Sequence, residues 1–365
     1  MFNDLEITNI FVDVKTPNDN LAYLCGVAER KTPEIREYAL GTRKIRKTKK
    51  YQITGRENKK VLQSKTPVEL VKDSMHYISV TNVLELLMQN PSARSMIANE
   101  RSSPDMLRGF KDGTLYQNHL FLQKYPLSVR LSIHIDDVEY CNALGSRKGK
   151  QKITVISFKV QNFDDRVNSN LDRVYNVLFV RSLLLKKYAF KKILRPLMED
   201  LTLLETDGVT LHLSNAESYT LRATFVHVLG DTLAIHELFE LMPPQSNIFC
   251  RACYISRAAF HEGRFGAEYP LRTRESISND LEALRNNSIA SLKCGLFRAA
   301  IFNSLRYFHF AEYASFDPMH DILEGVASLV IKGTLNYLVN QLKLISNADL
   351  NDRIVSFDYG VEEDQ

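Results

Sequence analysis

Residues 131–136 read LSIHID, and residues 224–231 read TFVHVLGD. The first stretch alternates apolar and polar residues, which predicts a strand that ends at Asp136. The second predicts another strand, which is followed by Asp231 and then by a helix in DTLAIHELFELM. Both stretches therefore place an acid at the end of a strand, and this placement decides the fold class that we expect.

The segments between these two acids predict a regular order of elements. KITVISFKV and RVYNVLFV are strand-like runs, and residues 183–205 have helical spacing that Pro196 should kink or split. A hairpin-like stretch, VTLHLSNAESYTLRA, precedes the last strand. The order is strand, strand, strand, helix, strand, acid, helix, which is the layout of RNase H-like nucleases and transposases. We therefore expect an α/β fold, an RNase H-like mixed sheet with flanking helices.

The two acids suit metal-dependent phosphodiester chemistry. Adjacent strands would bring Asp136 and Asp231 together although 95 residues separate them in the sequence. Cleavage of phosphodiester bonds commonly uses two divalent ions, one activating the nucleophile and one stabilising the leaving oxygen. Mg²⁺ (or Mn²⁺) prefers carboxylate ligands. Asp137 is a weaker candidate because alternation puts it on the opposite face of the strand.

Each acid also has a simpler interpretation. Asp136 could cap a turn at the edge of a sheet, and Asp231 could be only the N-cap of the following helix, since Asp is a favoured cap residue. Many α/β proteins place an Asp after a strand. The joint placement of the two acids favours the metal site.

Length and composition indicate an ordinary globular protein. The chain has 365 residues, of which 44% are hydrophobic and 25% charged. Five cysteines, two of them closely spaced, fit a reduced intracellular protein better than a secreted disulfide framework. We expect no signal peptide at MFNDLEITN and no membrane span.

Residues 43–60 concentrate positive charge, with nine Lys or Arg against one Glu. Such a segment can bind phosphates by releasing counterions, or act as a nuclear import signal. The alternative is a solvated, flexible arm.

Changes of pattern along the chain predict five regions. They are a basic, loosely ordered N-terminal region, a helical region, the RNase H-like core, a Cys-containing insertion, and a C-terminal helix with a tail, at residues 1–65, 66–125, 126–245, 246–316 and 317–365.

Cys250 and Cys253 form a Cys-x-x-Cys pair shortly after the helix that follows the second acid. Two thiolates at this spacing can hold two corners of a zinc tetrahedron. The other ligands must come from elsewhere, and His309, His320 and His261 are the candidates. The alternatives are two buried thiols without a metal, or a redox-active pair.

Residues 317–340 predict a helix with Asp317 as N-cap and Pro318 at its first position. Asp321 and Glu324 lie one turn apart, and either could supply a third carboxylate. The alternative is that acids in the first turn only stabilise the helix dipole.

Three sequence blocks resemble one group of mobile-element proteins. They are LSIHIDDVEYCNALGSRKGKQKI, VHVLGDTLAIHELF followed by FCRACY, and SLRYFHFAEYASFDPMHDILEGV. Together they resemble blocks of transposases and transposase-derived proteins related to the CACTA and Kyakuja–Dileera–Zisupton groups. The resemblance runs from about Val80 to the C-terminus.

This resemblance implies an RNase H-like fold with a zinc-binding insertion between the second and third acids, an arrangement similar to that of the antigen-receptor recombinase. It matches Asp136 to the first catalytic acid, Asp231 to the second and Glu324 to the third. The metal-binding positions match Cys250, Cys253, His320 and His309. It also implies DNA as partner and self-association, while the basic segment 43–60 leads us to expect a nuclear location.

The sequence departs from the family pattern at two places. Ala143 stands where the family usually has Pro, and the chain stops at a segment that continues in relatives, so we expect a C-terminal truncation. Three functions stay open: an active DDE-type transposase or nuclease, a domesticated or decayed descendant that binds DNA or protein without catalysis, and a redox or metal-handling protein.

Overall fold

The computed structural model describes residues 33–46, 68–100, 102, 105–107, 109–139, 152–213, 218–264, 269–286, 291–313 and 315–357. The chain divides into two compact units, Met1–Ser315 (the first unit) and Phe316–Gln365 (the second unit), and each is described by itself. The LGSRKGK stretch and most of the basic segment 43–60 lie outside the described residues.

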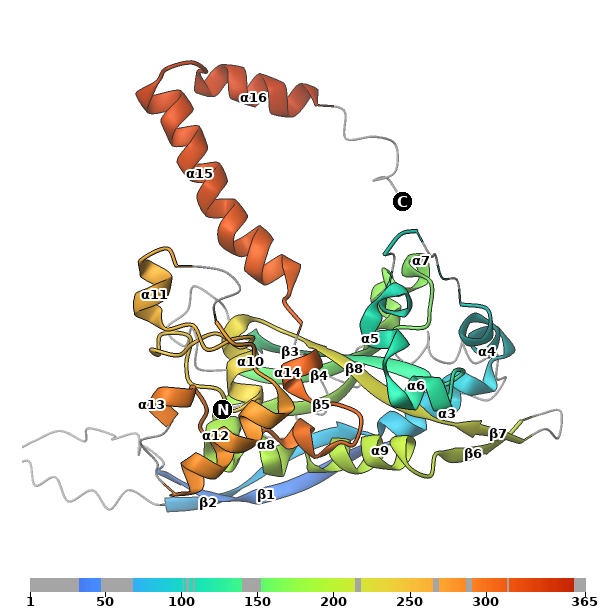
Figure 1. Cartoon of the computed structure of the whole chain (residues 1–365). Helices are drawn as coiled ribbons and strands as arrows, with labels where there is room; N and C mark the ends of the chain where they lie inside the picture. Colours follow the sequence, from blue (N-terminus) through green and yellow to red (C-terminus); the bar gives the residue numbers. More distant parts are fainter. Residues whose placement is uncertain are drawn as a thin grey trace, which may run out of the picture. The chain divides into compact units, whose positions relative to one another are not determined.

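The first unit is mixed α/β and is built on a six-stranded sheet of mixed orientation (Figure 1). The strands follow the order β1-β2-β5-β4-β3-β8. All neighbouring pairs are antiparallel except β3 and β8, which are parallel. The strands are β1 (Ile35–Arg46), β2 (Val68–Ile78), β3 (Val129–Glu139), β4 (Lys152–Val160), β5 (Tyr175–Arg181) and β8 (Ala223–Leu229).

The elements predicted around the two acids are confirmed. The strand-like runs are β3, β4, β5 and β8, and the hairpin is formed by β6 (Val209–His212) and β7 (Ser218–Leu221). The helical stretch is split into α8 (Ser182–Ile193) and α9 (Arg195–Glu205) with Pro196 in the first turn of α9, as the residue's missing N–H requires.

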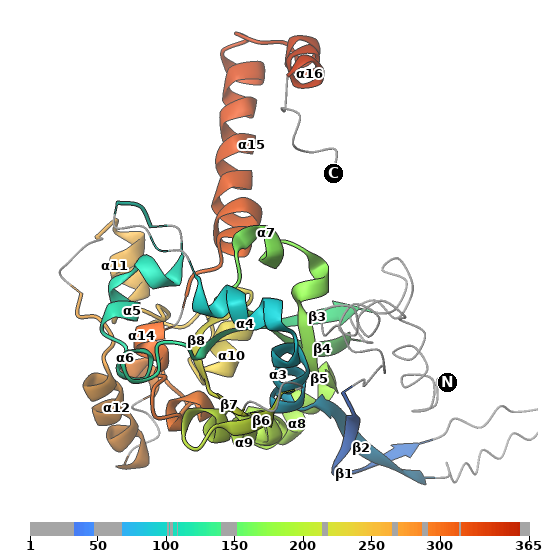
Figure 2. The ribbon, with the colours of Figure 1, turned by 90° about the vertical axis from the view of Figure 1, so that its right-hand side faces the viewer.

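Strands β1 and β2 were not predicted, because the sequence suggested a loosely ordered and then a helical region. They pair with each other along their whole length and run side by side in both views (Figures 1 and 2). In β2 the side chains of Asp73, Met75 and Tyr77 are buried in alternation. A buried acid hides this alternation in the sequence, since carboxylates are normally exposed.

Tertiary contacts stabilise the buried charge of Asp73. Its carboxylate is paired with the Arg43 Nε atom at 2.9 Å and the Lys187 Nζ atom at 2.7 Å, and it accepts a hydrogen bond from the Tyr188 hydroxyl at 2.9 Å. Although burial alone would raise the pKa of Asp73, these partners lower it. The strand therefore depends on residues of β1 and α8 that are distant in the sequence.

Helices cover the face of the sheet that carries Asp73. Helix α8 packs against β1, β4 and β5, and α9 packs against β8. The Tyr77 hydroxyl donates a hydrogen bond to Asp200 of α9 at 2.8 Å, which joins this helix to β2. The other described α-helices of the first unit are α3 (Val80–Gln89), α4 (Pro91–Ala98), α5 (Thr114–Gln117), α6 (Leu120–Lys124), α7 (Asp165–Asn168), α10 (Thr232–Leu238), α11 (Arg257–His261), α12 (Arg274–Asn286), α13 (Ser291–Cys294) and α14 (Phe310–Tyr313).

Aromatic side chains join residues 246–315 to the sheet. Phe308 stacks on Phe225 of β8 with 4.4 Å between ring centroids, and Phe310 stacks on Phe239 at 5.3 Å. Phe302 lies 5.1 Å from Phe225. Each of these rings is fully buried, so the Cys-containing segment shares the hydrophobic core of the first unit.

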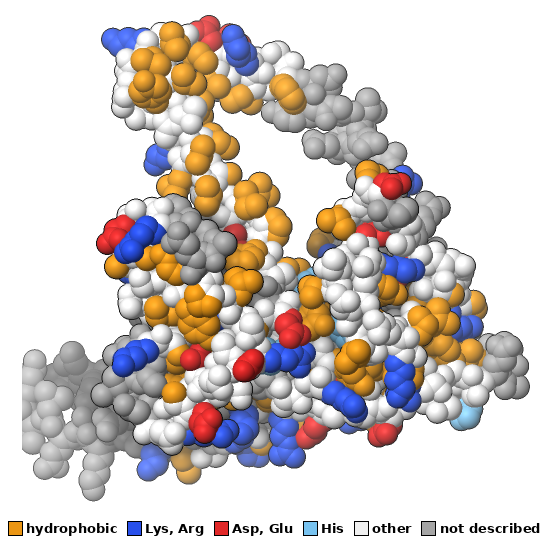
Figure 3. Space-filling model, in the orientation of Figure 1, with side chains coloured by type: hydrophobic (Ala, Val, Ile, Leu, Met, Phe, Trp, Pro, Cys, Tyr) orange, Lys and Arg blue, Asp and Glu red, His pale blue; other side chains and the backbone are white. Residues whose placement is uncertain are grey.

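The second unit contains a long helix and a shorter one. The long helix, Pro318–Gln341, comprises η5 (Pro318–Ala327), α15 (Ser328–Asn336) and η6 (Tyr337–Gln341), and α16 (Asn347–Ser356) follows. Hydrophobic side chains are exposed along the long helix (Figure 3). Among the described residues it is the one helix whose length and composition would allow it to cross a membrane, which is weak evidence when it stands alone.

Candidate functional site

The parallel pairing of β3 and β8 places Asp136 and Asp231 at matching positions. Cα partners run from Ser132 opposite His227 to His134 opposite Leu229. Asp136 follows His134 by two residues within β3, and Asp231 follows Leu229 by two residues, just beyond the end of β8. Adjacent strands lie about 4.8 Å apart, so the expectation that the fold joins these distant acids agrees with the strand register.

Gly230 allows the two strand ends to come this close. A Cβ atom at this residue would lie 2.9 Å from the Ile135 carbonyl oxygen and 3.0 Å from the Ile135 Cγ2 atom. Because Ile135 precedes Asp136, any side chain at Gly230 would push the two acid-bearing backbones apart.

The substitution Gly230→Ala is therefore expected to lower the free energy of unfolding by about 1–3 kcal/mol, the usual cost of overpacking. Urea denaturation of the purified protein measures this change. Gly109→Ala is a matched control, because a Cβ atom there would meet nothing within 4 Å. Equal stability of the two variants would contradict the close approach of β3 and β8.

Both acids are exposed, and among the described residues each accepts one local hydrogen bond. Asp231 is the N-cap of α10, and its carboxylate accepts a hydrogen bond from the Ala234 backbone N–H at 2.6 Å. Asp136 accepts one from the Asp137 N–H at 2.7 Å. The capping role proposed as the alternative for Asp231 is thus present, and it engages one carboxylate oxygen while leaving the other available.

A pocket of about 650 Å³ contains the two acids. Its polar lining comes from five elements, β3, β4, β5, α8 and α10 with its N-cap, and it contains both basic and acidic side chains. The charged and hydroxyl residues that line it are Asp136, Asp137, Lys152, Thr154, Arg181, Ser182, Lys186, Asp231 and Glu237.

Asp137 points to the helical face of the sheet, as alternation predicted. Its carboxylate accepts hydrogen bonds from the Thr154 hydroxyl at 2.6 Å and the Ser182 hydroxyl at 2.9 Å. Thr154 lies in β4 and Ser182 is the first residue of α8, so Asp137 joins this strand to the start of the helix. It nevertheless lines the same pocket as Asp136, because the pocket lies at the end of β3.

Glu237 is a pocket acid that the sequence analysis missed. It lies in the last turn of α10, and burial raises its pKa, with further upward contributions from Asp137 and Asp231 and a downward one from Lys186. The signal that could have found it is its position six residues after Asp231 on a predicted helix. Its neighbours make it the fourth acid of the pocket.

The donor set fits a magnesium ion only in part. Mg²⁺ usually takes one or two carboxylates and keeps several waters, and Asp136 and Asp231 offer two carboxylates within one pocket. Across the described residues, however, no three His, Cys, Asp or Glu side chains lie close enough together to hold one metal ion.

The two cysteines of the Cys-x-x-Cys pair lie close to each other. Cys250 and Cys253 are half-buried, free thiols, and they contact each other through a side-chain hydrogen bond. Burial raises the pKa of Cys253, while the nearby Arg272 lowers it. Arg272 orders this loop by donating from Nε to the Cys250 carbonyl at 3.0 Å and from Nη1 to the Cys294 carbonyl at 2.9 Å.

The histidines do not complete a ligand set with this pair in the described parts of the chain. His309 is buried against Phe310, its Nδ1 accepts from the Ala311 N–H at 3.3 Å, and burial lowers its pKa to about 4. His261 ends α11 and is exposed. His320 belongs to the second unit, where its Nδ1 atom lies 2.8 Å from Asp317.

Zinc therefore stays a prediction, and metal analysis tests it. The purified protein is expected to contain about one zinc ion per chain, and the double variant Cys250→Ser/Cys253→Ser is expected to contain none. Cys294→Ser, which alters a buried thiol outside the pair, should keep the metal. Equal zinc content in the double variant and the wild type would contradict the prediction.

Glu324, the predicted third acid, lies in the first helix of the second unit. The predicted start of this helix is confirmed, because Asp317 is its N-cap and accepts from the Met319 N–H at 3.0 Å. Asp321 accepts from the Asp317 N–H at 3.1 Å, so it stabilises the same helix start. Glu324 stays a prediction as a ligand.

The chain was also compared with known proteins. No family model matches it, and no match was found among the curated proteins.

Proposed function

We propose that this chain is a transposase-like protein with an RNase H-like core for metal-dependent cleavage of DNA phosphodiester bonds and strand transfer. The observation that carries the proposal is the pairing of β3 and β8, which sets Asp136 and Asp231 side by side at one end of the sheet. Three successive antiparallel strands, a helical pair and a parallel fourth strand that leads to the second acid support the RNase H-like assignment.

Asp136 and Asp231 would hold Mg²⁺ or Mn²⁺ between the ends of these strands. The ion would supply activation of the nucleophile and stabilisation of the leaving oxygen. The chain's own residues would position the scissile phosphate, because Lys152, Lys186 and Arg181 line the same pocket and carry the charge that a phosphate needs. Glu324 remains our proposed third acid, and Glu237 is a further candidate within the first unit.

A second function is a transposase-derived protein that binds DNA or a protein partner without cutting. It is favoured by one observation: the described acids of the pocket do not form a group of three that could hold a metal ion. Both proposals include self-association, which rests on the family resemblance, and a nuclear location, which rests on the basic segment 43–60. In either case the basic segment 43–60 would contribute to nucleic-acid contact or nuclear import.

The two functions are separated by incubating purified protein with supercoiled plasmid DNA and Mg²⁺ or Mn²⁺, with a chelator as control. Nicking that requires the metal supports the catalytic proposal. Folded protein that binds DNA but leaves the plasmid intact contradicts it and supports the non-catalytic function.

A further inference from the structure

We propose that a basic strip on the sheet face of Asp136 binds the phosphates of a DNA strand and leads that strand to the acid pocket. The strip is defined by Arg181 of β5, Lys72 of β2 and Lys44 of β1. This inference rests on the proposed function, because it assigns a path for the same substrate.

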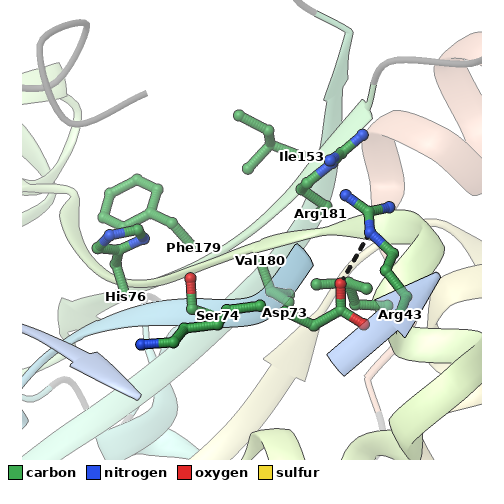
Figure 4. Close-up of a pocket in the computed structure, with 10 residues that line it drawn as sticks. Arg43, Asp73, Ser74, His76, Ile153, Phe179, Val180 and Arg181 are labelled. Atoms are coloured by element: carbon green, nitrogen blue, oxygen red, sulfur yellow. Dashed lines mark ion pairs between the residues drawn. The ribbon is translucent and has the colours of Figure 1, made fainter. Parts of the chain in front are cut away.

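The strand register places these residues on one face. Asp136 is opposite Val155, Val155 is opposite Phe179, and Phe179 is opposite His76. Directly paired residues share a face of the sheet, so the row from Asp136 to His76 crosses four strands on the side away from α8. Figure 4 shows Phe179 and His76 next to each other in this row.

The cations flank this row at steps of two residues, which keeps them on the same face. Arg181 follows Phe179 by two residues, and Lys72 precedes His76 by four. Lys72 is paired with Thr42, and Lys44 follows Thr42 by two. Spacings of about 4.8 Å between strands and about 3.4 Å per residue put the Arg181 backbone roughly 12 Å from that of Asp136.

Arg181 connects the strip to the acids because it lines two neighbouring hollows. One is the acid pocket, and the other is the groove lined by Arg43, Lys72, Ser74, His76 and Phe179 (Figure 4). The second hollow is small, about 30 Å³, so a DNA strand would lie across its rim and continue into the acid pocket past the Arg181 side chain.

Charge identifies the ligand as a polyanion. Lys44 and Lys72 are exposed, Arg181 is half-exposed, and none of the three takes part in an ion pair within the part of the chain that the structure describes. Asp73, the acid of the groove, is already neutralised by Arg43 and Lys187. Glu37, opposite His76, is the acid on the outer edge of this face. Uncompensated cations beside a phosphodiester-cleaving site fit a phosphate backbone.

The test measures binding of a fluorescently labelled DNA oligonucleotide by anisotropy, without divalent metal, over a range of salt concentrations. The triple variant Lys44→Gln/Lys72→Gln/Arg181→Gln is expected to bind at least about tenfold more weakly. Its slope of log affinity against log salt should be smaller by about two to three, because each lost phosphate contact removes about 0.7–0.9.

The matched control is Lys191→Gln/Arg285→Gln/Lys293→Gln, which removes the same charge from exposed positions on α8, α12 and α13. It should keep nearly the wild-type slope. Three results would overturn the strip. They are a wild-type salt slope in the strip variant, an equal loss of DNA affinity in both triple variants, and no DNA binding by the wild type.

The plasmid assay keeps this inference separate from the proposed activity. If the wild type binds through the strip but does not nick DNA, the strip is supported and the catalytic proposal fails. If the wild type nicks DNA while the strip variant binds with an unchanged slope, the activity is supported and the strip fails.

Discussion

Replacing either Asp136 or Asp231 with asparagine is expected to reduce metal-dependent nicking of plasmid DNA by at least about a hundredfold, which corresponds to about 2.7 kcal/mol in the activation barrier. The amide keeps the size of the side chain but removes the negative charge that Mg²⁺ requires. Rates of nicking measured at saturating metal give the effect directly.

The Asp231→Asn variant also distinguishes the metal site from the helix cap. Asparagine is as good an N-cap residue as aspartate, so it can still accept the hydrogen bond from the Ala234 N–H. If Asp231 only caps α10, the variant should fold and cut like the wild type. A folded variant that does not cut shows that the charge is needed.

Asp207→Asn is the control for this pair, since it removes an exposed acid from the turn between α9 and β6. It should nick at the wild-type rate. Unchanged nicking by both Asp136→Asn and Asp231→Asn would rule out the carboxylate site, and any nicking activity would then come from another part of the chain or a contaminant.

The second large effect concerns the stability of β3. The Arg130 side chain is 1% exposed and forms an ion pair with Glu100, whose side chain is 13% exposed. Its Nε and Nη1 atoms are buried and have no hydrogen-bond partner among the described residues. Glu100→Gln would leave a buried cation without its counter-charge, so the free energy of unfolding should fall by about 3 kcal/mol.

Urea denaturation at neutral pH measures this loss. Glu199→Gln is the matched control, because Glu199 pairs with Arg195 on the surface, where both side chains are more than half exposed. Such exposed pairs contribute about 0–1 kcal/mol. Similar, small losses in the two variants would show that Glu100 does not compensate the buried charge of Arg130.

Local sequence patterns were sufficient for the elements that carry the two acids. The alternation in LSIHID predicted β3. The Gly-Asp after TFVHVL predicted the end of β8 and the N-cap of α10. The break at Pro196 followed from the missing N–H of proline. These features depend on residues close together in the chain, so the sequence contains the information for them.

Features that depend on distant residues could not be predicted in this way. The sequence of β2 does not predict a strand, because a charged residue, Asp73, occupies one of its buried positions. The buried carboxylate is stabilised by ion pairs with Arg43 and Lys187 and a hydrogen bond from Tyr188. Glu237 becomes a pocket residue because α10 turns it toward Asp137 and Asp231. Its spacing from Asp231 on a predicted helix is a local signal, but its closeness to Asp137 depends on how α10 packs beside β3.

The sequence by itself determined the succession of elements from β3 to α10 along the chain, the two acids at strand ends and the cap of α10, because hydrophobic periodicity and capping act over a few residues. Only the tertiary structure decided that Asp136 and Asp231 line one pocket, since this depends on the parallel register of β3 and β8 and on Gly230 at their contact. The basic strip was likewise decided by strand pairing, which brings together residues from three strands that are far apart in the chain.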